Sequence, residues 1–468
     1  MTNRLPFKQT LDSLPDEWSI DPIPAIRSSI ARTGAKLAVL DDDPTGAQTV
    51  HDVAVLTDWS VDAIVEELAT DLPAMFLVTN SRSMPLARAQ AVTAEAGRNL
   101  REASARTGRR IDVVIRGDST LRGHFIGELT ALEQALGKGN DAWLLIPFFS
   151  EGGRYTIDDV HYVSDDEWLT PAGDTEFARD TAFSYRSSNL RKWVEEMTDG
   201  SVSAADVASI SINDLRLGGP ERVTEVLSDL EGGRVCVVNA VAMRDLEVLA
   251  QSLLAAEERG QRFLYRSAAS FVRARLGQTG RELLTADDLD LPKSGGALIV
   301  VGSHVARTNG QLDELLRRPG IASVEIDVAE LVSDAGTRET ARVAGFASGQ
   351  LRKGRDVAIY TSRTVLTGIN VAENLAIGER IASGVVEAVR GVEQRPRYVI
   401  VKGGTTASNV ATRSFGVARA VGRGQVAPGV PVWDLGPESR FPGLKLVVFP
   451  GNVGDPDALV EVVVKLSA

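Results

Sequence analysis

The stretch Lys36-Leu37-Ala38-Val39-Leu40-Asp41-Asp42-Asp43-Pro44-Thr45-Gly46 joins a short apolar run to an acidic turn. Short apolar runs bounded by turn residues are typical of buried strands in parallel sheets. The same pattern recurs at Ala74–Val78, Ile111–Ile115 and Trp143–Ile146. Helical stretches such as Leu86–Ala105 lie between these runs. The alternation predicts an α/β fold with mostly parallel sheets flanked by helices.

The pattern returns after the segment Asp287–Gly296, which carries three aspartates, a proline and two glycines. Apolar runs that end at polar or glycine-rich turns follow at Ala297–Val301, Val357–Tyr360, Tyr398–Val401 and Leu446–Phe449. A chain of 468 residues is long enough for two domains or more. We therefore expect an N-terminal domain over residues 1–290 and a C-terminal domain over residues 295–468.

The middle of the chain shows a weaker pattern. Residues 151–185 are polar and are expected to form mainly loops. Two further strands are expected at Val235–Asn239 and Phe263–Tyr265. The one cysteine, Cys236, lies in an apolar run, so an intramolecular disulfide is excluded and a buried core position is expected.

Composition limits the classes of partner. The formal net charge of -12 argues against bulk affinity for nucleic acid or an anionic membrane surface. No apolar stretch approaches the roughly 20 residues needed to cross a bilayer, and the first residues lack the apolar core of a signal peptide. We expect a cytoplasmic protein.

The acidic turn is a candidate for chemistry because ligands of open α/β sheets bind beyond the carboxyl ends of strands. Asp41, Asp42 and Asp43 would repel one another, so their adjacency needs a reason. They can act as a general base toward a hydroxyl or bind magnesium. The alternative is a solvated turn whose side chains cap the following helix.

A second group of polar residues follows two other expected strands. Arg82 follows one strand, and Arg116 and Arg122 enclose a Gly-Asp-Ser-Thr-Leu segment after the next. Arginine binds carboxylates and phosphates with two parallel hydrogen bonds, and the Asp, Ser and Thr side chains can bind hydroxyls. The group suits a small polyhydroxy acid, although an ordinary helix start with surface ion pairs is the alternative. We expect His124 and His161 to be structural.

Glycine-rich turns mark the C-terminal half. Lys402-Gly403-Gly404-Thr405-Thr406 and Pro450-Gly451-Asn452-Val453-Gly454 each follow an expected strand, as does Gly302-Ser303-His304. Glycine lets backbone amides approach phosphate closely, which favours a nucleotide site, although tight turns also use glycine without a ligand. The sequence contains neither a P-loop motif nor a dinucleotide-binding fingerprint.

Together, the turns at 42–47, 116–123, 402–406 and 450–454 resemble those of the four-carbon acid sugar kinase family. The resemblance extends from about Leu37 to the C-terminus. It implies an N-terminal substrate domain, a C-terminal ATP domain and transfer of the ATP γ-phosphate to threonate, erythronate or a 3-oxo-tetronate. Phosphoryl transfer from ATP also calls for Mg²⁺, for which no protein ligand is assigned.

The resemblance assigns residues by position. Asp42 and Asp43 would orient or deprotonate the attacking hydroxyl. The substrate pocket would further contain Arg82, Arg116, Asp118, Ser119, Thr120 and Arg122. The nucleotide would be held by Ser303, Gly403, Gly404, Thr405, Thr406 and Gly451. Pro44, Arg116 and Thr405 depart from the residues common in the family, namely Leu, Lys and Glu, which leaves the exact substrate open.

Two other functions stay open at this point. A metal-dependent sugar-acid aldolase or dehydratase would use the acidic turn without ATP. A sugar-acid sensor would bind the same ligand without turnover. The oligomeric state also stays open, with a homodimer as one alternative, because cytoplasmic sugar kinases are often dimers.

Overall fold

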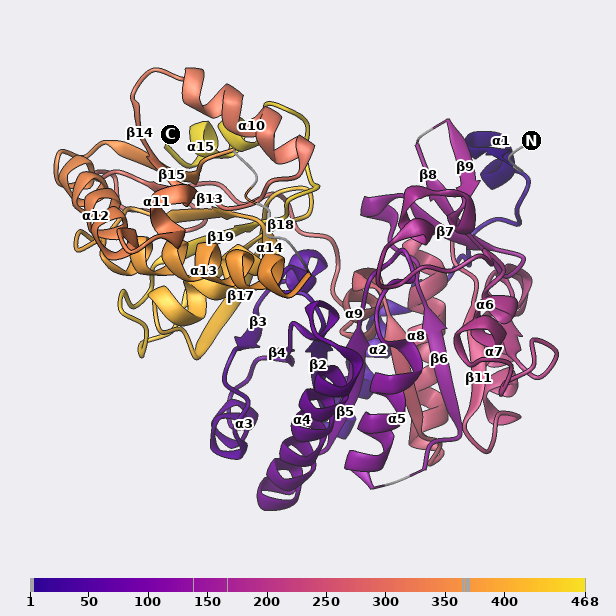
Figure 1. The fold of residues 1–468 in the computed structure, drawn as a ribbon. Helices are drawn as coiled ribbons and strands as arrows, with labels where there is room; N and C mark the ends of the chain where they lie inside the picture. Colours follow the sequence, from indigo (N-terminus) through magenta and orange to yellow (C-terminus); the bar gives the residue numbers. More distant parts are fainter. Residues whose placement is uncertain (1–3, 138, 166, 364–365, 367–370, 468) are drawn as a thin grey trace. The chain divides into compact units, whose positions relative to one another are not determined.

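The computed structural model describes residues 4–137, 139–165, 167–363, 366 and 371–467. Contacts between Cα atoms divide the chain into two compact units. Residues 1–53 and 58–280 form the N-terminal unit, and residues 54–57 and 281–468 form the C-terminal unit. Figure 1 labels the main helices and strands of both units.

The N-terminal unit contains seven parallel strands in the order β10-β11-β6-β12-β5-β2-β4. Their bounds are β2 Lys36–Asp41, β4 Ala74–Val78, β5 Ile111–Arg116, β6 Ala142–Ile146, β10 Ala208–Ile210, β11 Arg234–Val238 and β12 Phe263–Ser267. Every residue of β2 and β4 is buried, which explains why these strands appear in the sequence as unbroken apolar runs.

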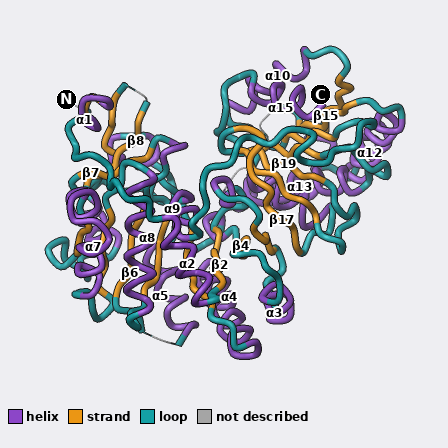
Figure 2. The backbone as a smooth tube through the Cα atoms, turned by 180° about the vertical axis from the view of Figure 1, so that it is seen from behind, coloured by secondary structure: helices purple, strands orange, loops and turns teal. Residues whose placement is uncertain are grey.

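Helices flank this sheet and connect its strands (Figures 1 and 2). They are α2 Ile23–Thr33, α3 Val61–Leu68, α4 Leu86–Thr107, α5 Phe125–Leu136, α6 Leu190–Met197, α7 Gly219–Ser228, α8 Met243–Glu258 and α9 Ala269–Arg275. Ser60 caps the start of α3, where its side chain accepts a hydrogen bond from the Ala63 amide. The apolar faces of the helices cover the sheet, and Cys236 of β11 is fully buried as expected.

A small antiparallel sheet departs from the expectation of loops over residues 151–185. Its order is β1-β9-β8-β7, with bounds β1 Leu5–Pro6, β7 Arg154–Ile157, β8 Val160–Ser164 and β9 Trp168–Pro171. The short helix α1 Phe7–Asp12 follows β1. β7 and β8 form a hairpin whose turn residues, Asp158 and Asp159, have φ of 50° and 64°. Aspartate tolerates this left-handed conformation, which two-residue hairpin turns require.

The C-terminal unit has a mixed sheet in the order β17-β18-β19-β16-β13-β15-β14. The strands from β19 to β14 run parallel, whereas β17, β18 and β19 pair antiparallel. The bounds are β13 Leu298–Val301, β14 Ile321–Ile326, β15 Asp356–Thr361, β16 Val399–Lys402, β17 Arg419–Ala427, β18 Val430–Leu435 and β19 Lys445–Phe449. The helices are α10 Ala306–Arg317, α11 Val328–Val332, α12 Gly336–Arg352, α13 Val371–Arg390, α14 Gly404–Asn409 and α15 Ala458–Ser467.

One strand of the C-terminal unit comes from the N-terminal part of the sequence. β3 (Val53–Leu56) neighbours β17 at the edge of the C-terminal sheet. The following residue, Thr57, donates a backbone hydrogen bond to the Ala418 carbonyl at 3.0 Å. The chain therefore enters the C-terminal unit soon after the acidic turn and then returns to form α3.

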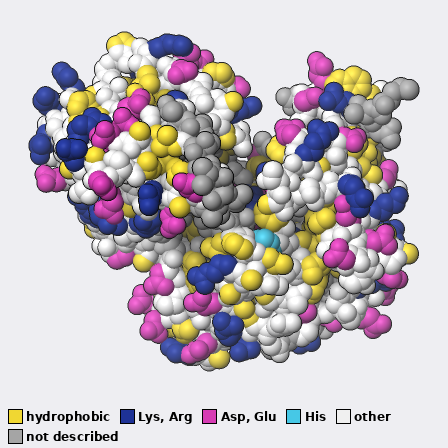
Figure 3. Space-filling model, viewed as in Figure 1, with side chains coloured by type: hydrophobic (Ala, Val, Ile, Leu, Met, Phe, Trp, Pro, Cys, Tyr) yellow, Lys and Arg dark blue, Asp and Glu magenta, His cyan; other side chains and the backbone are white. Residues whose placement is uncertain are grey.

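The α/β fold class predicted from the sequence is confirmed. The described helices include none that is long and apolar enough to cross a membrane. Acidic and basic side chains are interspersed over the face drawn in Figure 3.

Candidate active site

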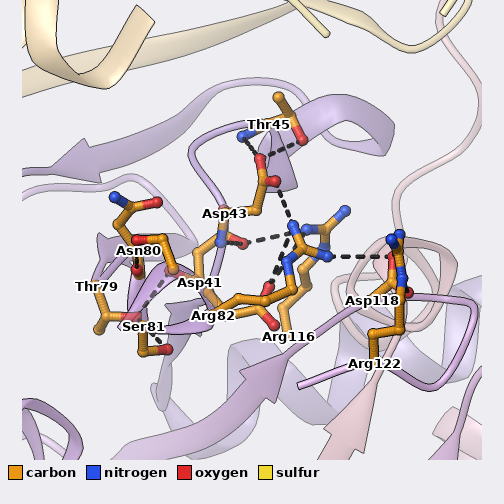
Figure 4. Close-up of polar contacts among 12 residues, drawn as sticks. Asp41, Asp43, Thr45, Thr79, Asn80, Ser81, Arg82, Arg116, Asp118 and Arg122 are labelled. Carbon is orange, nitrogen blue, oxygen red and sulfur yellow. Dashed lines mark hydrogen bonds and ion pairs between the residues drawn. The ribbon is translucent and has the colours of Figure 1, made fainter. Parts of the chain in front are cut away.

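The carboxyl ends of neighbouring parallel strands bring polar residues to one edge of the N-terminal sheet. Asp41 at the end of β2 is in register with Arg116 at the end of β5 and with Val78 at the end of β4. Ser267 of β12 is in register with Arg116 on its other side. The acidic turn, the Arg82 turn and the loop after Arg116 therefore meet at this edge (Figure 4).

Asp41 is buried under the turn that follows it. A Cβ atom at Gly46 would overlap the Asp41 carboxylate, so this position requires glycine. Burial raises the pKa of Asp41 to about 8, and its neighbours Asp42 and Asp43 add to the effect against the opposing charge of Arg116. At neutral pH this carboxyl group is therefore mainly protonated, which relieves the repulsion within the triplet.

Asp43 is held by the turn and by an arginine. Its Oδ1 accepts hydrogen bonds from the Thr45 amide at 2.9 Å and the Thr45 hydroxyl at 2.7 Å, and its Oδ2 accepts one from Arg82. Burial alone would raise the pKa of Asp43, but the charges of Arg82 and Arg116 outweigh it and hold the pKa below its ordinary value. Both oxygens of Asp43 are thus engaged.

The carboxylate of Asp42 differs from that of Asp43 because only one of its two oxygens is hydrogen-bonded. Its side chain is buried, and its Oδ1 has no hydrogen-bond partner among the described residues. Oδ1 lies 3.9 Å from a guanidinium nitrogen of Arg82 and 3.9 Å from one of Arg116. A buried, unpartnered carboxylate oxygen is costly, so this atom is the strongest sign of a ligand position in the cluster.

The loop after β5 forms a second network around Asp118. Arg82 Nη1 lies 3.1 Å from Asp118 Oδ1, and Arg122 Nε lies 2.9 Å from Asp118 Oδ2. Burial opposes ionisation of Asp118, but these two arginines lower its pKa well below the ordinary value. The Thr120 hydroxyl also donates to Asp118, and the Ser119 carbonyl accepts a hydrogen bond from His161 at 2.8 Å.

The two histidines have structural partners, as expected. Burial lowers the pKa of His161 to about 4, so its ring is neutral. Because a carbonyl can only accept, Nε2 of His161 carries the proton, and Nδ1 accepts from the Thr156 hydroxyl at 2.9 Å. His124 Nε2 likewise lies 2.8 Å from the Met84 carbonyl oxygen.

The predicted substrate residues therefore come together in one cluster. Asp42, Asp43, Arg82, Arg116, Asp118, Thr120 and Arg122 are linked by the ion pairs and hydrogen bonds above, and Ser119 lies in the same loop. The Thr120 hydroxyl is already bound to Asp118, so Thr120 supports the loop. The described residues include no group of three His, Cys, Asp or Glu side chains placed to hold one metal ion.

Sequence reasoning missed two arginines. Arg266 of β12 is buried and forms ion pairs with Glu128 of α5 at 2.9 Å and with Asp42 at 3.4 Å. Arg154 of β7 contacts the face of the Phe177 ring, 5.1 Å from the ring centroid, and Arg122 lies 5.3 Å from the same centroid. Neither arginine belongs to a recognisable motif, so only the fold places them at the site.

Arg154 differs from the other arginines of the cluster in its partners. Arg82, Arg116, Arg122 and Arg266 each form ion pairs with a carboxylate, which for Arg116 is that of Asp42, whereas Arg154 forms none with the described residues. Its Nε is buried without a hydrogen-bond partner, and Nη1 donates only to the Gly152 carbonyl. Burial accordingly lowers the pKa of Arg154. Among these five arginines, Arg154 is therefore the one without an ion pair to a described carboxylate.

In the C-terminal unit, three glycine-containing turns converge. A Cβ atom at Gly451 would lie 3.0 Å from Ser303 Oγ, and one at Gly403 would lie 3.2 Å from both Ser303 Cβ and Thr406 Oγ1. Gly403 has a φ of 114°, which strongly favours glycine. Thr308 of α10 links two of the turns, because its hydroxyl is 3.2 Å from Ser303 Oγ and 3.1 Å from the Gly451 carbonyl.

A cavity of about 240 Å³ lies beside these turns within the C-terminal unit. Apolar side chains of α13, including Ile381 and Val385, form one wall, and Thr405 and Thr406 contribute to another. The predicted nucleotide residues Ser303, Gly403, Gly404, Thr405, Thr406 and Gly451 all lie in the converging turns or at the start of α14. An apolar pocket next to glycine-containing turns is an arrangement that suits a nucleotide.

Lys402 supports the turn that follows β19. Its side chain is fully buried, and Nζ donates to the Pro450 carbonyl at 2.6 Å and to the Val453 carbonyl at 3.3 Å. Nζ also lies 3.9 Å from the centroid of the Phe449 ring. Burial lowers the pKa of Lys402 to about 7, with a further contribution from Arg307.

Comparison with known proteins identifies relatives over most of the chain. It is 27% identical to a D-threonate kinase from Salmonella typhimurium over 357 residues, 74% of this chain and 78% of the relative. It is 25% identical to a D-threonate kinase from Cupriavidus necator over 382 residues, 81% of this chain and 84% of the relative.

Solved structures show the same fold. A Haemophilus influenzae protein of the DUF1537 family aligns with a TM-score of 0.64 at 19% identity, over 92% of this chain and all of that one. A crystal structure from Salmonella typhimurium LT2 aligns with a TM-score of 0.66 at 18% identity, over 91% of this chain and 98% of that one. At this identity the likeness concerns the fold alone.

Family models match both parts of the chain. One described as a sugar-binding N-terminal domain matches residues 37–275, and one described as a nucleotide-binding C-terminal domain matches residues 298–459. Together they account for most of the sequence, and the chain belongs to the four-carbon acid sugar kinase family, a family of phosphotransferases.

Proposed function

We propose that the protein is an ATP-dependent kinase that transfers the γ-phosphate to a hydroxyl of a four-carbon sugar acid. The observation that carries the proposal is the buried, unpartnered Oδ1 of Asp42, which lies between the guanidiniums of Arg82 and Arg116. A carboxylate oxygen in this position can accept a hydroxyl proton while the arginines balance the charge around it. Family membership and the two relatives named D-threonate kinase support the reaction class.

The chemical step follows from the reaction class. The hydroxyl oxygen of the sugar acid forms a bond to the γ-phosphorus, the bond from that phosphorus to the β–γ bridging oxygen breaks, and ADP leaves. The hydroxyl proton passes to Asp42. Asp43 is the weaker candidate base because Thr45 and Arg82 already engage both of its oxygens.

We assign the carboxylate of the sugar acid to Arg154 and Arg122. Arg154 has no carboxylate partner among the described residues, and both guanidiniums contact the Phe177 ring. Arginine is suited to this task because its planar fork matches a carboxylate. Asp118, held between Arg82 and Arg122, would then accept hydrogen bonds from hydroxyls of the substrate.

We assign the nucleotide to the C-terminal unit. The turns at Ser303, Gly403 and Gly451 would bind the phosphates through backbone amides other than that of Gly403, which donates to the Phe449 carbonyl at 2.8 Å. The cavity beside α13 would receive the apolar part of the nucleotide. Mg²⁺ would neutralise phosphate charge when ATP is bound. Since no three-residue metal cluster occurs among the described residues, the phosphates themselves would supply most of its ligands. The cytoplasmic location and the homodimer remain predictions.

A coupled assay of ADP release with Mg-ATP tests the proposal. The acceptors are both enantiomers of threonate and of erythronate, together with their 3-oxo derivatives, and D-threonate comes first because two relatives carry that name. We expect ADP release that depends on at least one of these acids.

Direct measurement of sugar-acid consumption and of sugar-acid binding, beside ADP release, separates the two rival functions. Consumption of a sugar acid without ATP would indicate an aldolase or dehydratase. Binding of a sugar acid without turnover, even at saturating Mg-ATP, would indicate a sensor. Either result would overturn the kinase assignment.

A further inference from the structure

We infer that Arg266 is a positioning residue, which fixes the carboxylate of Asp42 so that its Oδ1 faces the acceptor hydroxyl. The inference rests on the proposed function, because it takes Asp42 as the base. Arg266 lies on β12, one residue before Ser267, which is in register with Arg116 of β5. Its backbone is therefore held in the parallel sheet of the N-terminal unit, while the residues that its side chain contacts lie on turns and on a helix.

The contacts of Arg266 reach three parts of the site. Nη2 lies 3.4 Å from Asp42 Oδ2 and 3.4 Å from the Arg122 carbonyl oxygen, and Nη1 lies 2.9 Å from Glu128 Oε2. One rigid guanidinium thus connects the acidic turn, the loop after β5 and α5. A guanidinium presents several donors in a fixed plane, so it constrains the directions of these groups as well as their charge.

The loop after β5 is shaped around this guanidinium. A Cβ atom at Gly117 would overlap the Arg266 guanidinium, and one at Gly123 would come within 2.5 Å of Nη2. The Gly117 amide also donates to the Ser267 carbonyl at 2.8 Å, which ties the start of the loop to β12. Two glycines with no room for a side chain show that the loop closes tightly on Arg266.

Glu128 holds Arg266 from the opposite side. Glu128 is buried on α5, and the Ser81 hydroxyl donates to its Oε1 while Arg266 occupies its Oε2. Burial raises the pKa of Glu128 against the opposing charge of Arg266. Arg266 is therefore clamped between two carboxylates and has little freedom to turn toward a substrate.

As a result, the two carboxylate oxygens of Asp42 have different surroundings. Oδ2 is occupied by Arg266, and Oδ1 is the oxygen without a hydrogen-bond partner. If Arg266 is shortened or displaced, the Asp42 carboxylate can rotate, and Oδ1 loses its orientation toward the hydroxyl. Misplacement of a catalytic group by about 1 Å can cost about 100-fold in rate. Substrate affinity, which we assign to other residues, should change much less.

The test compares R266K with R275K as a matched control. Arg275 is also a buried arginine of the N-terminal unit, with ion pairs to Glu257 at 2.7 Å and Asp112 at 2.8 Å, but it has no contact with the acidic turn. For R266K we expect kcat with Mg-ATP and the best sugar acid to fall about 100-fold, with KM for the acid changed by less than about threefold. R275K should keep both constants near those of the wild type.

A second variant tests the same point with Arg266 in place. Gly117→Ala introduces a methyl group against the guanidinium and should also lower kcat without a matching rise in KM. Gly280→Ala is its control, because an added Cβ there meets no atom within 4 Å. If R266K does not fold, as judged by thermal unfolding, the Gly117→Ala pair decides the matter.

The outcomes separate this inference from the proposed function. If the wild type turns over a sugar acid but neither R266K nor Gly117→Ala lowers kcat more than its control does, or either mainly raises KM, Arg266 does not position the base. If the wild type transfers no phosphate to any sugar acid of the panel, the proposed function fails and the inference fails with it.

Discussion

At the scale of single residues, the candidate site contains four aspartates that differ in their hydrogen-bond and ion-pair partners. Asp43 and Asp118 are bound by arginines and neighbouring side chains, Asp41 is buried under its turn, and Asp42 keeps one oxygen unpartnered. The triplet of aspartates is evident in the sequence, but the different role of each member depends on hydrogen bonds that only the fold creates.

The role of Asp42 leads to a prediction about turnover. Asp42→Asn should lower kcat by about 100- to 10,000-fold, the range that a general base contributes, because the amide cannot accept the hydroxyl proton. Asp43→Asn is the control: it loses an ion pair with Arg82 and should mainly raise KM for the sugar acid. Steady-state kinetics of both variants provide the measurement. Near-normal kcat in Asp42→Asn would remove this residue from the chemical step.

The raised pKa of Asp41 predicts that the free energy of unfolding depends on pH. Its pKa in the folded protein is about 8, above the ordinary value of 3.8, so the folded state holds a proton that the unfolded state releases. The contribution of this proton to the free energy of unfolding is complete below pH 4 and is lost as the pH rises to about 8. Relative to wild type, Asp41→Asn should therefore gain about 1.4 kcal/mol of unfolding free energy per pH unit between pH 5 and pH 7.

Urea unfolding of both proteins at several pH values, monitored in the N-terminal unit, measures this difference. A difference between Asp41→Asn and wild type that stays constant with pH would contradict the protonated state of Asp41.

The proposed contact between Arg154 and the substrate carboxylate leads to a prediction about substrate affinity. Arg154→Gln should raise KM for the sugar acid about 10- to 100-fold, because the substrate carboxylate would lose a buried charged partner. The residual activity with the corresponding neutral sugar alcohol should be unchanged, which a general structural defect would not produce. Arg191→Gln is the control, since Arg191 binds the backbone carbonyls of Ala204 and Ala205. Equal effects on acid and alcohol would refute the assignment.

At the scale of elements, the sequence predicts most of the parallel strands because they are buried on both faces, but the parallel strands β10 and β14 are not among the expected ones. Ala74–Val78 and β4 coincide, and the other expected strands differ from the observed ones by one or two residues at their ends. The expected strand Phe263–Tyr265 ends just before Arg266, because the last two residues of β12, Arg266 and Ser267, are polar and do not continue the apolar run. The sequence therefore does not predict Arg266 at the end of a strand.

The elements that sequence reasoning missed have weaker patterns. β7 and β8 mix polar and apolar residues, since they form a small sheet with its own cluster of Ile157, Tyr162 and Leu169. β3 is a short apolar run, but nothing local indicates that it pairs in the C-terminal unit. Long-range pairing of this kind depends on the whole fold.

The turn after β19 carries a prediction for nucleotide binding. Lys402→Met keeps the length and apolar character of the side chain, but it removes the Lys402 donor from the Pro450 carbonyl and leaves the Val453 carbonyl with Gln311 as its donor. Without these hydrogen bonds the turn should hold its binding conformation in a smaller fraction of the molecules, so the Kd for ATP should rise about tenfold.

Calorimetric titration with ATP measures this effect, and Lys465→Met is its control. Lys465 also donates to backbone carbonyls of the C-terminal unit, at Leu283 and Val426, but away from the glycine turns. Equal affinities in the two variants would show that Lys402 does not shape the nucleotide site.

At the scale of the whole molecule, the residues that we propose for the two ligands lie in different compact units. The arginine–carboxylate cluster belongs to the N-terminal unit, and the glycine turns and their cavity belong to the C-terminal unit. Binding of the two ligands should accordingly be separable: Arg154→Gln should leave ATP affinity unchanged, and Lys402→Met should leave sugar-acid affinity unchanged. Family membership supports phosphoryl transfer.

The central claim is that phosphate moves from ATP to a hydroxyl of a sugar acid. Phosphorus NMR of a reaction with Mg-ATP and the acid that releases most ADP follows the phosphate directly. The account predicts a new phosphomonoester signal of the sugar acid that grows in step with ADP and is nearly absent with Asp42→Asn. A signal of inorganic phosphate alone would mean hydrolysis of ATP, and an unchanged ATP spectrum with every acid would contradict the kinase outright.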